Sequence, residues 1–265
     1  MTLFEAIILG IVQGLTEFLP VSSSGHIELG SYLLNIQAAD NLLFSIIVHA
    51  ATALSTIVVF RKDILSIFSD LLKFEWNEGT QLTFKILLSM IPIGIVGLLF
   101  EEEIASFFGG KITFVGFMLL ITAMLLAFSH YAPIKPGNVT FPKALIIGLA
   151  QTVAILPGIS RSGATISTAL LLGIDRERAA RFSFLMVLIP ILGGSLLKLL
   201  DFIEDPSISE GLTAGVLVAG FIAAFVAGLA ACLWMINIVK KGKLIYFAIY
   251  CAIIGTLAII GGYLL

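Results

Sequence analysis

The sequence predicts an all-α polytopic membrane protein made of two inverted-topology repeats, each with a re-entrant broken helix pair plus three transmembrane helices. Three observations predict this class: the composition, the lengths of the apolar segments and an internal repeat. Of 265 residues, 59% are apolar and 12% charged, and the mean hydropathy is +1.10. Ordinary soluble domains are about 45–50% apolar and about one quarter charged. So apolar a composition, with so few charged residues, is not that of a nucleic-acid binder with a basic face, and nucleic acid is not an expected partner.

Six apolar segments are long enough to cross about 30 Å of hydrocarbon, which takes about 17–25 helical residues. They are residues 42–60, 82–100, 112–129, 182–200, 212–239 and 244–265. Four shorter apolar segments form two pairs, 6–19 with 27–36 and 144–156 with 163–174, and proline, glycine and serine interrupt each pair. Such a break predicts two helices that enter the membrane and return to the side from which they came.

The basic residues predict the orientation. If segment 61–85 is a cytoplasmic loop, twelve of the fifteen basic residues fall inside, and the acidic loops 101–111 and 201–211 fall outside. This distribution obeys the positive-inside rule. We therefore expect a multi-pass plasma-membrane protein with both termini outside. The first broken pair then opens outward and the second opens to the cytoplasm.

An offset of 138 residues aligns segment 6–36 with segment 144–174 without gaps, and ten of the 31 positions are identical. The identities include Gln13 with Gln151 and a Ser-x-Ser-Gly motif, which chance matching of apolar residues does not explain. We interpret 1–265 as one membrane domain with repeats at about 1–130 and 139–265. Three spans per half make the second half inverted, and inverted repeats with broken helices bind ligands near the midplane, where the breaks meet.

The two breaks contain three ionisable side chains, Glu17, His26 and Arg161, at positions where the repeat is not symmetric. An ionisable group in the membrane is costly and indicates function. Serines beside His26 suggest a nucleophile with a neighbouring base, and Glu17 is suited to orient the imidazole. Arg161 offers a fork of donors that matches phosphate oxygens. The combination predicts phosphoryl transfer.

Other groups in the breaks are expected to surround the phosphates with hydroxyl and backbone donors. They are Ser22, Ser160, Ser162, Gly163 and Thr165. Gln13 and Gln151 are expected to support the site by hydrogen bonding. A purely structural role, the satisfaction of backbone groups, stays open for Ser24 and Ser162. His49 is predicted to make only a hydrogen bond between helices.

The segments EFLPVSSSGH (17–26) and PGISRSGAT (157–165) resemble the bacitracin-resistance type of undecaprenyl-pyrophosphate phosphatase, and the similarity extends over the full chain. The resemblance implies hydrolysis of a C55 polyprenyl pyrophosphate to the monophosphate and inorganic phosphate. This reaction recycles the lipid carrier for cell-wall glycans and confers bacitracin resistance. The resemblance also implies the fold of two inverted repeats with re-entrant helices.

For the site, the resemblance implies Ser23 as the nucleophile, with Glu17, His26 and Arg161 around the phosphates. It further implies a divalent cation, Mg²⁺ or Ca²⁺, that supports activity. Members of the family carry either Glu or Gln at position 13. Because Gln13 stands here, the cation is expected to bind Glu17 and the phosphates of the substrate.

Three points stay open on the sequence alone. One is whether the chain forms a homodimer. A transporter or flippase for an anionic lipid or solute is the alternative function, since inverted repeats serve alternating access; a transporter needs no nucleophile. Ser22 competes with Ser23 as that nucleophile. We expect polyprenyl pyrophosphate and membrane lipids as partners, and a site that is reached from the extracytoplasmic face.

Overall fold

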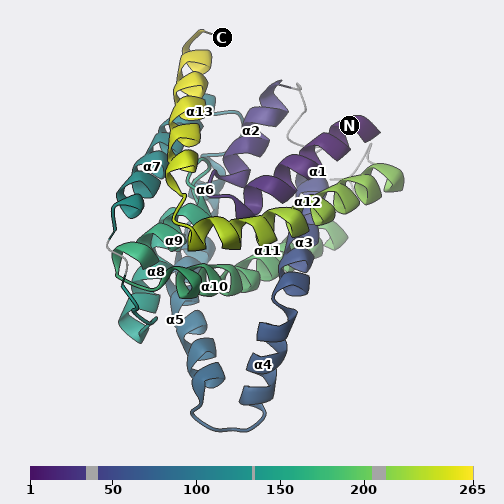
Figure 1. Ribbon diagram of the computed structural model, residues 1–265. Helices are drawn as coiled ribbons and strands as arrows, with labels where there is room; N and C mark the ends of the chain where they lie inside the picture. The colour runs from purple at the N-terminus through teal and green to yellow at the C-terminus, as the bar shows by residue number, and fades with distance from the viewer. Residues whose placement is uncertain (34–40, 133–134, 205–212, 265) are drawn as a thin grey trace.

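The computed structural model describes residues 1–33, 41–132, 135–204 and 213–264, and its named elements are all α-helices (Figure 1). They are α1 (Leu3–Phe18), α2 (Ser23–Leu33), α3 (Asn41–Val59), α4 (Arg61–Leu71), α5 (Glu78–Leu99), α6 (Glu101–Ala105), α7 (Ile112–His130), α8 (Phe141–Val153), α9 (Arg161–Leu171), α10 (Arg176–Met186), α11 (Leu188–Glu204), α12 (Ala214–Lys240) and α13 (Ile245–Leu264). Within the described residues, five helical stretches are long and apolar enough to span a membrane, or six if the bent pair α3–α4 is one span. The predicted class, an all-helical polytopic membrane protein, is confirmed.

The helices follow the predicted spans, and the main differences lie in the expected loops. Segments 61–85 and 101–111 were expected to be loops, but they contain α4 and α6. The chain bends by 74° between α3 and α4, and α4 forms because Ile64 and Ile67, on one helical face, pack against the core. Residues 34–36, 205–211, Leu212 and Leu265, which belong to predicted segments, lie outside the described residues.

Both broken pairs are present as helices joined by short turns, α1 to α2 and α8 to α9. Each turn contains a residue with positive φ, Ser22 at 71° and Gly158 at 98°. The second helix of each pair begins with the same contact, because Ser22 Oγ accepts from the Gly25 N–H and Ser160 Oγ accepts from the Gly163 N–H. These contacts lie 138 residues apart, as the repeat predicts. The inversion of the halves stays a prediction.

Helices from one half of the chain pack against helices from the other half. α1 lies against α12, α8 against α5, and α7 runs beside α13 (Figure 1). The repeat-related glycines Gly10 and Gly148 permit the first two contacts, since a Cβ at either would collide with a backbone carbonyl oxygen, of Gly220 or Ser89. Small residues of this kind let membrane helices approach closely. The close packing brings the two turns together.

Gly158 should tolerate no side chain. A Cβ there would lie 2.5 Å from the Val115 carbonyl oxygen and 2.7 Å from Met118 Cβ, and its φ disfavours any other residue. We expect Gly158→Ala to lower the free energy of unfolding by about 2 kcal/mol or more, measured as a lower Tm in detergent. Gly94→Ala is the matched control, because a Cβ at Gly94 meets nothing within 4 Å. Equal Tm values for the two variants would show that the structure around Gly158 can accommodate a Cβ.

Candidate active site

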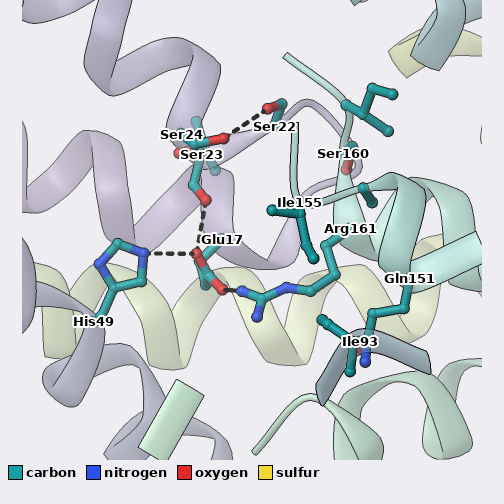
Figure 2. A pocket seen from close by; sticks show the side chains of 13 residues that line it. Glu17, Ser22, Ser23, Ser24, His49, Ile93, Gln151, Ile155, Ser160 and Arg161 are labelled. Atoms are coloured by element: carbon teal, nitrogen blue, oxygen red, sulfur yellow. Dashed lines mark hydrogen bonds and ion pairs between the residues drawn. The ribbon is translucent and has the colours of Figure 1, made fainter. Parts of the chain in front are cut away.

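A cavity of about 170 Å³ lies where the two turns meet (Figure 2). Six helices and the turns between them contribute its lining, in which polar and charged side chains alternate with isoleucines. The lining residues are Thr16, Glu17, Ser22, Ser23, Ser24, His49, Ile93, Gln151, Ala154, Ile155, Ile159, Ser160 and Arg161. The sequence prediction that the site forms between the two breaks therefore matches the position of this cavity.

Glu17, in the last turn of α1, lies at the centre of the polar contacts in the cavity (Figure 2). Only 4% of its side chain is exposed. Its Oε1 pairs with the Arg161 guanidinium, and its Oε2 accepts from Ser23 Oγ at 2.7 Å and from Gln13 Nε2 at 3.0 Å. His49 Nε2 lies 3.9 Å from the same Oε2. A buried carboxylate requires such compensation, because desolvation costs several kcal/mol for an isolated charge.

The two candidate nucleophiles have different environments. Ser22 Oγ accepts from two backbone N–H groups, of Gly25 at 3.2 Å and of Gly158 at 3.1 Å. Both lone pairs of this hydroxyl are therefore occupied by the turns. Ser23 Oγ instead donates to the Glu17 carboxylate, which is the arrangement that a nucleophile with an adjacent base needs. The geometry favours Ser23 over Ser22.

The other expected phosphate ligands divide into two groups. Ser22 and Ser160 line the cavity, whereas Ser162, Gly163 and Thr165 do not. Ser162 Oγ donates to the Leu19 carbonyl at 3.2 Å, and Thr165 Oγ1 donates to the Arg161 carbonyl at 3.0 Å. Short hydroxyl side chains readily bond the backbone in this way near a helix start.

His26 and His49, two of the three histidines, take positions that the sequence pattern did not indicate. His26 is outside the cavity lining, and its ring nitrogens lie 2.8 Å from the Ser22 carbonyl oxygen and 2.8 Å from the Tyr250 hydroxyl. His49 lines the cavity, with Nδ1 2.8 Å from the Ser45 carbonyl oxygen of its own helix. Its place beside Glu17 was missed because it lies inside a long apolar span, far from both motifs. The sequence signal that could have identified His49 is its ionisable ring, because an ionisable group inside a membrane span indicates function.

Gln13 and Gln151 are both fully buried. Within the described residues, the side-chain carbonyl oxygen of each has no hydrogen-bond partner. Gln13 donates to Glu17, as its predicted supporting role requires. Gln151 lines the cavity near Arg161 and Ile93 (Figure 2). Buried acceptors without partners are rare, and the oxygen of Gln151, a lining residue, is therefore available to a bound ligand, water or cation.

The comparison with known families decides the classification. The model of a family described as bacitracin resistance protein BacA matches residues 6–257. The chain belongs to this family. Relatives named undecaprenyl-diphosphatase include one from Christiangramia forsetii, 57% identical over 265 residues and 99% of each chain. Others come from Bacteroides fragilis, 56% identical over 97% of each chain, and Parabacteroides distasonis, 55% identical over 98% of each. The resemblance inferred from the two motifs is confirmed.

Arg161 should not be replaceable by lysine. Lysine keeps the charge but loses the planar fork that contacts a carboxylate and phosphate oxygens together. We expect Arg161→Lys to lower kcat/KM for phosphate release by about 100-fold or more, the scale of one strong transition-state contact. The control is Arg181→Lys, since Arg181 pairs with Asp63 outside this cavity at 2.7 Å. If Arg161→Lys keeps wild-type kcat/KM, Arg161 acts only as a counter-ion for Glu17.

Proposed function

We propose that the polar cavity is the active site of an undecaprenyl-diphosphatase. The chain hydrolyses undecaprenyl pyrophosphate to the monophosphate and inorganic phosphate, which returns the lipid carrier to cell-wall synthesis and underlies bacitracin resistance. The observation that carries the proposal is the 2.7 Å hydrogen bond from Ser23 Oγ to Glu17 beside the Arg161 guanidinium. Family membership and the names of the relatives support the same activity.

The reaction takes place in two steps. Ser23 Oγ attacks the terminal phosphorus, its proton passes to Glu17, and the bond from that phosphorus to the bridging oxygen breaks. Polyprenyl monophosphate leaves with the bridging oxygen, and the phosphoryl group stays on Ser23. Water then attacks the phosphoserine, which releases inorganic phosphate and returns a proton to Ser23 Oγ. Glu17 serves as base in the first step and, by the same short contact, exchanges the proton in the second.

Arg161 binds the phosphates and stabilises the transition state. Its guanidinium has five N–H donors in a fixed fork, and its hydrogen bond to Glu17 comes from one nitrogen, NH2. Among the described residues only Glu17 accepts from this guanidinium, so the remaining donors can contact phosphate oxygens as negative charge develops. Its side chain is 25% exposed, so the charge is only partly screened by water. We place Ser160 and Ser22, whose hydroxyls line the cavity, around the same anion.

A divalent cation is compatible with this donor set, although the fit is limited. Among the described residues, no three or more His, Cys, Asp or Glu side chains converge as metal ligands. Glu17 and the unpartnered Gln13 Oε1 beside it are the protein oxygens offered. This suits Mg²⁺, which binds through one or two carboxylates and substrate phosphates, better than Ca²⁺, which takes about 6–8 oxygens. When bound, the cation would neutralise charge on the pyrophosphate.

A transporter or flippase is not favoured. Alternating access requires charge complementarity at the midplane, which Arg161 alone would provide. It does not require a hydroxyl that donates to a buried carboxylate, and the relatives carry the name of a phosphatase. Three isoleucines in the lining, Ile93, Ile155 and Ile159, suit the first isoprene units of a lipid substrate.

We further propose that the site opens to the extracytoplasmic face. The positive-inside distribution of basic residues supports this orientation, because it makes the pair α1–α2, with Glu17 and Ser23, open outward. The acidic segment 101–111 then lies on the same face, where a divalent cation would reduce its repulsion of an anionic head group.

Ser23→Ala should abolish turnover and leave the fold intact, because its hydroxyl contacts Glu17 rather than the backbone. Ser22→Ala should instead lower the Tm in detergent by an amount that corresponds to about 1–3 kcal/mol, since two buried N–H groups lose their acceptor. Phosphate release from a long polyprenyl pyrophosphate and thermal unfolding of each variant are the measurements. An active Ser23→Ala together with a stable, inactive Ser22→Ala would exchange the two roles.

Single cysteines should reveal the accessible face. Ser24 lines the cavity and belongs to the outward-opening pair, whereas Ser162 belongs to the other pair. A membrane-impermeant thiol reagent added to intact cells should label Ser24→Cys faster than Ser162→Cys. The unsubstituted chain is the control, because Cys232 and Cys251 are fully buried. Labelling of Ser24→Cys only after the cytoplasmic face is exposed would reverse the proposed orientation.

A further inference from the structure

His26 connects the turn before Ser23 to a helix from the other end of the chain. Its Nδ1 lies 2.8 Å from the Ser22 carbonyl oxygen, and its Nε2 lies 2.8 Å from the hydroxyl of Tyr250 on α13. The planes of the two rings are 12° apart, as in-plane hydrogen bonding allows. His26 therefore makes its two polar contacts away from the cavity.

The chemistry of these partners defines the protonation of the ring. A carbonyl oxygen can only accept, so Nδ1 carries the hydrogen and donates it to Ser22. In the neutral imidazole, Nε2 then accepts from the Tyr250 hydroxyl. Tyr250 is 40% exposed on a membrane-spanning helix, where a hydroxyl without a partner is costly. Within the described part of the chain, the Tyr250 hydroxyl and His26 Nε2 are therefore hydrogen-bond partners of each other.

The backbone that receives this hydrogen bond needs support. Ser22 has φ of 71°, a region that non-glycine residues rarely adopt and that costs about 1–3 kcal/mol. Its hydroxyl accepts from two N–H groups and its carbonyl accepts from His26. These contacts determine the orientation of the next peptide, which carries Ser23.

α13 supports the same turn at a second point. The Cys251 thiol, adjacent to Tyr250, lies 3.7 Å from the Pro20 carbonyl oxygen. The other turn has a corresponding support from α7, where Thr122 Oγ1 accepts from the Ser160 N–H and donates to the Gly158 carbonyl, each at 3.0 Å. Because α7 and α13 pack side by side (Figure 1), one helix pair supports both turns.

We propose that Tyr250 is a positioning residue of the phosphatase, which acts through His26 and the Ser22 backbone to keep Ser23 Oγ on Glu17. His26 is then a positioning residue as well, and Glu17 is the base. The inference rests on the proposed role of Ser23 as the nucleophile. It adds a residue of the last helix, far from both sequence motifs, to the machinery of the reaction.

The test compares kcat and KM for phosphate release from a long polyprenyl pyrophosphate by the purified full chain. Tyr250→Phe removes one hydroxyl and should lower kcat about tenfold, the scale of one lost hydrogen bond, with KM unchanged because Arg161 still binds the phosphates. Tyr246→Phe is the matched control, since Tyr246 is 64% exposed one turn earlier on α13. Its kcat should equal that of the wild type.

His26 variants separate positioning from acid–base chemistry. His26→Asn places an amide N–H where Nδ1 was, so it keeps the donor to Ser22 without any base. We expect it to retain at least tenfold more kcat than His26→Ala. The double variant Tyr250→Phe/His26→Ala should be no slower than His26→Ala, because the two residues act as one unit. Tm values of all variants are measured to confirm that each is folded.

Three outcomes would overturn the proposal: wild-type kcat in Tyr250→Phe, equal loss in His26→Asn and His26→Ala, or additive losses in the double variant. Two other results would contradict the proposed function itself, rather than the role of Tyr250. They are wild-type turnover in Ser23→Ala, or no phosphate release from the polyprenyl substrate by the wild-type protein.

Discussion

The ion pair between Glu17 and Arg161 is the interaction on which the rest of the structure depends. It joins α1 to α9 across 144 residues of sequence and is largely removed from solvent, with 4% and 25% of the side chains exposed. A buried pair repays its desolvation only when the remaining polar atoms are also satisfied. Ser23, Gln13 and His49 surround Glu17 for this reason. The interlocked packing of the two halves is what keeps both turns at the distance that the pair requires.

A pair of this kind is a poor device for stability alone, since apolar residues of similar volume often stabilise as well or better. In the proposed mechanism, Arg161 transfers part of its contact from the carboxylate to an incoming phosphate, and Glu17 then becomes a stronger acceptor for the Ser23 proton. The proposal therefore couples substrate binding to activation of the nucleophile through one guanidinium.

The internal repeat explains the scaffold, and its departures from symmetry explain the chemistry. Ser22 and Ser160 make equivalent contacts to the N–H of the glycine three residues on, and Gly10 and Gly148 allow equivalent helix contacts. In the repeat, Glu17 corresponds to Ile155, which also lines the cavity. Equivalent positions of the repeat thus place a carboxylate and an isoleucine in the lining of the same cavity.

Composition and segment length were sufficient to predict an all-helical membrane protein, because the hydrocarbon core imposes both on any spanning helix. The motifs were sufficient for the family, and they predicted a site between the two breaks, where the cavity lies, because prolines, glycines and ionisable residues inside apolar segments indicate function. The helices α4 and α6, the different hydrogen-bond partners of Ser22 and Ser23, and the placement of His49 in the cavity and of His26 against Tyr250 came only from the tertiary structure. These depend on which side chains meet across segments distant in the chain. The direction of the Ser22 hydroxyl and of the His26 imidazole follows from Gly158 and Tyr250, which are more than 130 residues away. The sequence around Ser22 and His26 does not identify these partners.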